Sequence, residues 1–150
     1  DGNPIIDWNI DKDTLMVNYK SENDKKFPFG QYIFSQAPNV YIILPKLSAI
    51  VSNGIPTIIQ GWNTDSLTIK QKNFAVILRD NTIKHLFTET EAGAHLVIQD
   101  KNTIDHSLIN AKDSSIVEID KDVFKTFQLE TDSTVKMNIP QSVIKKMKQL

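Results

Sequence analysis

The chain has 150 residues, of which 40% are hydrophobic and 23% are charged. This composition is typical of a folded domain with a buried core, and it excludes a disordered or collagen-like chain. Lys and Arg number 17 against 18 Asp and Glu, so the net charge of -1 gives no basis for non-specific nucleic-acid binding. No apolar run is longer than 40–44, which is too short to span a membrane. The absence of cysteine excludes disulfides, thiolate zinc sites and cysteine nucleophiles.

Short apolar segments recur from residue 45 onward at intervals of roughly 20 residues, the range expected for solenoid coils. One set is 47–50, 67–69, 86–87, 108–109 and 127–129. A second set alternates with it: 57–59, 76–78, 96–98, 117–119 and 135–137. Turn-forming residues separate the two sets within each unit, at 52–54, 71–73, 91–93, 113–115 and 132–134.

These segments are too short for helical periodicity, and the turns between them cannot hold crossover helices. The sequence therefore predicts an all-β fold, a parallel β-helix (β-solenoid) of about five coils whose inward side chains stack in columns. The first expected column is Thr57, Val76, Leu96, Val117 and Val135, and beside it lie Ile59, Leu78, Ile98, Ile119 and Met137. A β-sandwich is the alternative, because regularly spaced short strands suit it too. Recurrence of the whole strand-turn-strand-turn unit favours the solenoid.

Both ends of an open solenoid need covers, because unpaired strand edges recruit other chains. Residues 8–19 are predicted to form a hairpin around a turn at 11–13, and the aromatic residues of 27–41 a capping cluster. At the other end, Ser142 is expected to N-cap a short helix. Its apolar face would hold Val143, Ile144, Met147 and Leu150, and its basic face Lys145, Lys146 and Lys148. A calmodulin-target or membrane-surface helix is an alternative interpretation of this amphipathic stretch.

The predicted organisation is one domain over 1–150. Residues 1–44 form the N-terminal cap and first strand, 45–139 the coils, and 140–150 the C-terminal cap.

Three aspartates, Asp80, Asp100 and Asp120, recur every 20 residues at the ends of second-set strands. Stacked carboxylates would repel one another unless a cation such as calcium neutralised them, which makes these residues weak candidates for a metal site. The simpler interpretation is that each aspartate begins a turn. We therefore expect no metal and no cofactor.

Two of the three histidines would stack if Ile83 is aligned with Ile104. His85 and His106 could then present two imidazoles to a metal, although ordinary surface histidines are the simpler interpretation. The same alignment predicts an alternating charge ladder of Lys84, Asp105 and Lys125.

The inward columns imply an outward apolar stripe made of Ile58, Ile77 and Val97. The equivalent positions in the next coils are expected to be Glu118 and Lys136. A contiguous exposed apolar patch normally marks a covered or interacting surface. The N-terminal aromatic segment or a second chain is the expected cover.

The run 40–50 ends in Leu44-Pro-Lys-Leu47 and is followed by Ser52-Asn53-Gly54 and the strand 57–61. This pattern, together with Trp8 and the Asp13-Thr14-Leu15 sequence after it, resembles the GIN domain, described as an autotransporter adhesin head domain. The resemblance implies a right-handed parallel β-helix in a secreted or cell-surface bacterial protein, often of the Bacteroidetes type. It implies no catalytic activity.

The sequence holds no Ser/His/Asp order, glycine-rich phosphate loop or HExxH pair. It therefore predicts a non-catalytic binding or adhesion/assembly module. The resemblance implies a location outside the cytoplasm, and a first residue that is not Met agrees weakly with an exported segment. The expected partner is a cell-surface protein or a glycan, with oligomer formation left open and no nucleic acid. A small polysaccharide-active enzyme of β-helix type and a purely structural spacer are the alternatives.

Overall fold

The structure, a computed structural model, describes residues 5–20 and 40–147. The chain divides into two compact units, Asp1–Ile43 and Leu44–Leu150. In the first unit, β1 (Ile5–Asp11) and β2 (Thr14–Lys20) pair antiparallel, which confirms the predicted hairpin. Most of the predicted aromatic cluster at 27–41 lies outside the described residues.

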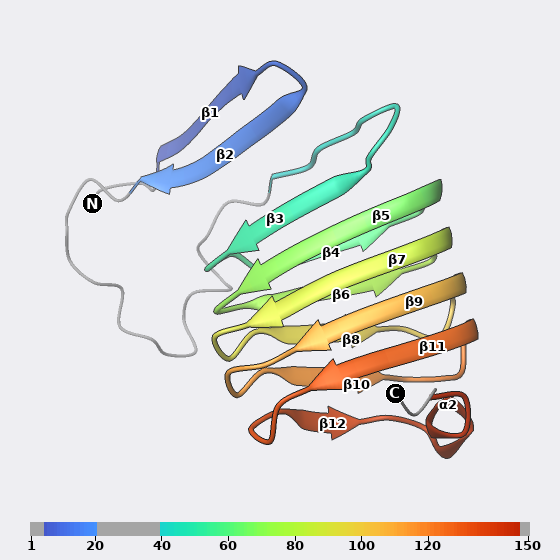
Figure 1. The fold of residues 1–150 in the computed structure, drawn as a ribbon. Coiled ribbons are helices and arrows are strands. Elements are labelled where there is room, and N and C mark those ends of the chain that lie inside the picture. Colours follow the sequence, from blue (N-terminus) through green and yellow to red (C-terminus); the bar gives the residue numbers. More distant parts are fainter. Residues whose placement is uncertain (1–4, 21–39, 148–150) are drawn as a thin grey trace. The chain divides into compact units, whose positions relative to one another are not determined.

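The second unit is a β-solenoid built from two parallel sheets, as predicted. The long-strand sheet contains β3 (Ala49–Asn53), β5 (Asn63–Lys72), β7 (Thr82–Glu91), β9 (Thr103–Ala111) and β11 (Phe124–Thr131). The short-strand sheet contains β4 (Thr57–Gln60), β6 (Ala75–Arg79), β8 (His95–Ile98), β10 (Ile116–Ile119) and β12 (Lys136–Asn138). Figure 1 shows the strands of each sheet stacked one above another along this unit. Five strands in a sheet are joined by about four turns of the chain, slightly fewer than the five coils expected.

The core consists of side chains stacked between the two sheets. Val76 pairs with Leu96, and Leu96 with Val117, and all three are fully buried. These apolar, largely β-branched residues suit a pleated surface buried on its inner face. Thr57 and Ile59 of β4 start the two columns in the predicted register, so the predicted columns are confirmed from β4 to β10.

In the last turn, the predicted register is wrong by two residues. Met137 pairs with Val117, the place expected for Val135. Its side chain is 53% exposed, because β12 is the last strand of this sheet in the part of the chain that the structure describes.

The long strands break the usual alternation of inward and outward residues. In β7, Ile83 and Leu86 are buried, while Lys84 and His85 between them are both exposed. Inward residues are thus three positions apart, whereas a regular strand places them two apart. Two adjacent residues of each turn therefore reach the outer surface at this place.

Two buried asparagines join successive turns. Asn81 Nδ2 donates hydrogen bonds to the Ile59 carbonyl (2.9 Å) and to Asn102 Oδ1 (3.0 Å). Asn102 Nδ2 in turn donates to the carbonyls of Leu78 (2.8 Å) and Gln99 (2.7 Å). The stack therefore satisfies backbone groups buried where the chain passes from one sheet to the other.

A short C-terminal helix, α2 (Gln141–Ile144), covers the last turn through Val143, which is fully buried. The predicted N-cap is wrong: Pro140 occupies that position, because its φ of -58° suits the entry to a helix, and Ser142 lies inside the helix. Ile144 is 52% exposed, so it does not share the buried face. Lys146 joins the cap to the coils through Asp122 (2.8 Å) and the Phe124 carbonyl (2.6 Å).

Replacing Leu96 or Ile98 by Ala is expected to cost about 2–5 kcal/mol of unfolding free energy, because each change leaves a cavity in the core. Val97, between them, points outward and is only half-buried, so Val97→Ala should cost less. Chemical denaturation of the three variants measures this difference. Equal losses at all three positions would contradict the inward-outward assignment.

The asparagine stack predicts that Asn102→Ala destabilises the fold by roughly 2 kcal/mol or more, because the buried carbonyls of Leu78 and Gln99 lose their donor. Asn138→Ala, an exposed change in β12, is the matched control and should have little effect. Thermal and urea unfolding compare the two. Similar stability of both variants would show that the stack contributes nothing.

Candidate functional site

The apolar stripe expected from the sequence lies on the outer face of the short-strand sheet. Ile58 pairs with Ile77, and Ile77 with Val97, so the three side chains form one row. Ile58 is 57% exposed, and the other two are half-buried. The row continues to Glu118 and then to Asn138, where Lys136 was expected, because of the two-residue shift in the last turn. A role of the stripe in interaction stays a prediction.

The three recurring aspartates do not form one row. Ile98 pairs with Ile119, 21 residues later, so the 20-residue spacing of Asp100 and Asp120 leaves them one position out of register. All three side chains are exposed, and Asp80 accepts a hydrogen bond from Gln60 (3.2 Å). Among residues 5–20 and 40–147, no group of three or more His, Asp or Glu side chains is placed to hold a metal ion.

Two histidines are brought together on the outer face of the long-strand sheet. Ile83 pairs with Ile104, the alignment that stacks His85 on His106. The ring centroids are 5.1 Å apart and the planes differ by 16°. The nitrogen lone pairs lie in these nearly parallel planes, so they cannot converge on one ion between the rings. The pair is therefore a stacked platform, and it is held in place by the 2.9 Å contact of His106 Nδ1 with Thr126 Oγ1.

The histidine pair forms part of a shallow hollow of about 430 Å³, which we call the trough. Its first row consists of Ser66, His85, His106 and Thr126, one from each of four paired strands. Its second row consists of Phe87, Leu108 and Gln128. Leu86 and Ser107 lie between the rows and form the floor. The trough therefore crosses the strands of four successive turns.

Sequence reasoning found the histidine stack but missed the trough. The prediction from the sequence assumed regular alternation, in which only every second residue of a strand points outward. Under that assumption Lys84 and His85, which are adjacent, cannot both be on the outer surface, as they are in the structure. A usable signal was present: a charged residue is followed by Ser, His, His or Thr in successive turns, as Asp65-Ser66, Lys84-His85, Asp105-His106 and Lys125-Thr126.

A ladder of charges follows one side of the trough. Lys84 pairs with Asp65 (2.5 Å), and Lys125 with Asp105 (2.7 Å), which confirms the predicted alternation. Hydrogen bonds from these lysines lower the pKa of both aspartates below the usual value. Both carboxylates are thus ionised and neutralised by a neighbouring turn.

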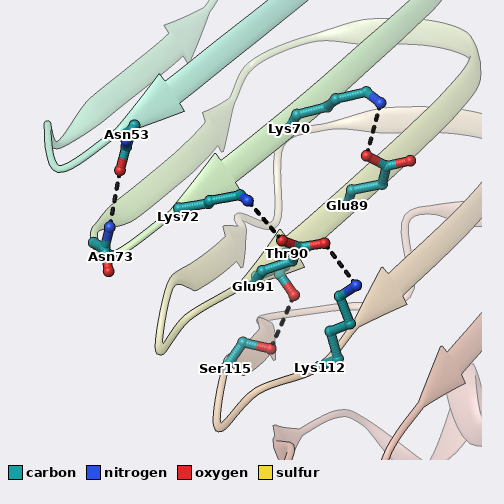
Figure 2. Close-up of polar contacts among 9 residues, drawn as sticks. All are labelled: Asn53, Lys70, Lys72, Asn73, Glu89, Thr90, Glu91, Lys112 and Ser115. Atoms are coloured by element: carbon teal, nitrogen blue, oxygen red, sulfur yellow. Dashed lines mark hydrogen bonds and ion pairs between the residues drawn. The ribbon is translucent and has the colours of Figure 1, made fainter.

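A second ladder lies beyond the other side of the trough, further along the same strands. Figure 2 shows Lys70 paired with Glu89 (2.8 Å), and Glu91 paired with both Lys112 (2.8 Å) and Lys72 (3.0 Å). The hydrogen bonds from Lys112 and Lys72 lower the pKa of Glu91. None of the described residues that line the trough is Asp, Glu, Lys or Arg, so the trough lies between two ladders of ion-paired side chains and has no permanently charged residue of its own.

Comparison with known proteins finds no matching family model, no matching curated protein and no matching solved structure. The part of the chain that the structure describes has no helix with the length and apolarity needed to cross a membrane.

The Glu91 pairs predict an acid-sensitive contribution to stability. Because folding lowers the pKa of Glu91 from 4.5, this contribution is fully present above that value and is lost as the pH falls through the lower folded-state pKa. Glu91→Gln should therefore lower the melting temperature at about pH 6 and flatten its decrease toward about pH 3. Glu130→Gln, an exposed change on the outer face of β11, is the control. Parallel melting curves for wild type and Glu91→Gln would contradict the pairing.

Proposed function

We propose that this protein is a non-catalytic binding module that holds an extended ligand in the trough. The observation that carries the proposal is the trough itself, in which stacked imidazoles, hydroxyls, an amide and an aromatic ring gather on one sheet face. These side chains stand on β5, β7, β9 and β11, which are paired in sequence. Groups on rigid paired strands lose little freedom when a ligand binds, which favours affinity.

The ligand has to be held through side chains. In β7 and β9 the backbone is already paired on both sides, so the floor of the trough cannot add a peptide strand by backbone pairing. Binding on this face therefore depends on the two rows of side chains.

The charges beside the trough favour binding over catalysis. Hydrolysis of a glycosidic bond typically uses a pair of carboxyl groups, one as the acid and the other as the base or nucleophile. The nearest carboxylates, Asp65 and Asp105, are each held by a lysine, and both have a lowered pKa. A polysaccharide-active enzyme is thus the less favoured alternative, and a pure spacer would have no use for a lined trough.

The proposed location is outside the cytoplasm, as a secreted, periplasmic or outer-membrane-anchored protein. The resemblance to the GIN domain supports this location. Adhesion to a cell-surface partner is the corresponding biological role.

The test is binding of labelled protein to bacterial envelope fragments. Ser66→Trp should abolish binding, because Ser66 is exposed and an indole at this position fills the trough beside His85. Ser133→Trp, in an exposed turn away from the trough, is the matched control and should bind as wild type does. Binding that is unchanged by Ser66→Trp, or absent from wild type, would contradict the proposal. Release of reducing sugar ends from the fragments would favour the enzyme.

A further inference from the structure

We infer that the ligand of the trough is an uncharged linear glycan that lies across the strands of the long-strand sheet. This inference rests on the proposed function and specifies its ligand.

The charge of the trough selects against ionic ligands. The two flanking ladders contain five lysines and four carboxylates, and every one of these lysines is in a direct ion pair, such as Lys84 with Asp65 and Lys70 with Glu89. A polyanion such as a nucleic acid gains most of its affinity from cations that are free to meet phosphates. The described lining supplies none of the four permanently charged residue types, and the cations nearest to it already hold carboxylates.

The direction of the trough suits a linear polymer with a short repeat. Each row takes one residue from each turn, as Ser66, His85, His106 and Thr126 show. Neighbouring strands are about 4.8 Å apart, close to the length of one sugar in an extended glycan chain. Successive sugars could therefore meet equivalent positions on successive turns.

The two rows offer complementary chemistry. Phe87 and Leu108 are half-buried on the outer face and present an apolar surface, against which the C–H face of a sugar ring can pack. Opposite them, the imidazole nitrogens of His85 and His106 and the hydroxyl of Ser66 can donate or accept hydrogen bonds. Sugar hydroxyls need partners of both kinds, so the pattern fits a glycan better than a fatty or charged molecule.

Affinity electrophoresis tests this inference with folded full-length protein. The gels contain one neutral polymer each: hydroxyethylcellulose, xyloglucan, galactomannan, arabinoxylan or dextran. Polygalacturonate and duplex DNA serve as the charged probes. Retardation by at least one neutral polymer, and by neither charged probe, is the expected result.

Variants locate the binding on the trough. His85→Ala removes an exposed side chain, so its fold should be intact, and Phe87→Ala removes the apolar ring. Each should weaken retardation about tenfold, the order expected from losing one hydrogen bond at His85 or one packed ring at Phe87. Ser133→Ala changes an exposed turn residue away from the trough and should leave retardation unchanged.

The outcomes separate this inference from the proposed function. No retardation by any neutral polymer, or equal retardation of wild type and His85→Ala, overturns the glycan inference. Retardation by a charged probe alone also overturns it. In each case the proposed binding role is judged independently, by whether Ser66→Trp abolishes attachment to envelope fragments.

Discussion

Residue-by-residue parallel pairing between successive turns is the constraint on which the rest of the structure depends. It stacks Val76, Leu96 and Val117 into one buried column, and it stacks His85 on His106 outside. A turn contains 19, 20 or 21 residues. Which side chains share a row therefore depends on where the longer turns place their additional residues. The core, the asparagine stack, the charge ladders and the trough are all consequences of this single register.

Much of the fold could be predicted from the sequence because inward residues must be apolar. The interval at which they recur gives the length of one turn of the solenoid. The prediction failed where side chains are no longer required to be buried and apolar. Met137 takes the place expected for Val135 in β12, the last strand of its sheet among residues 40–147, where burial no longer specifies the register. The constant spacing of the aspartates also gave a wrong prediction of their alignment. Asp100 and Asp120 are 20 residues apart, but the solenoid turn between them is 21 residues long. The trough was missed because the double outward step at Lys84 and His85 violates strict alternation.

The two outer faces of the solenoid differ in their chemistry. The short-strand sheet carries the apolar row of Ile58, Ile77 and Val97, which ends at Glu118. The long-strand sheet carries ion-pair ladders on either side of the trough, whose described lining holds no Asp, Glu, Lys or Arg. Individual surface ion pairs contribute little to stability. The arrangement of these pairs matters mainly because it sets the electrostatic potential at the trough. Ion-paired flanks and a mixed polar and aromatic lining together favour recognition of an uncharged ligand.

Disulfide trapping measures the register directly, because the chain has no cysteine of its own. Ile77 pairs with Val97, and adjacent strands about 4.8 Å apart lie within the Cα separation that a disulfide accepts. We expect the double variant Ile77→Cys with Val97→Cys to form an intramolecular disulfide under mild oxidation. The shifted pair, Ile77→Cys with Gln99→Cys, should stay largely reduced. Equal trapping of both pairs, or faster trapping of the shifted pair, would contradict the parallel register on which the fold and the trough depend.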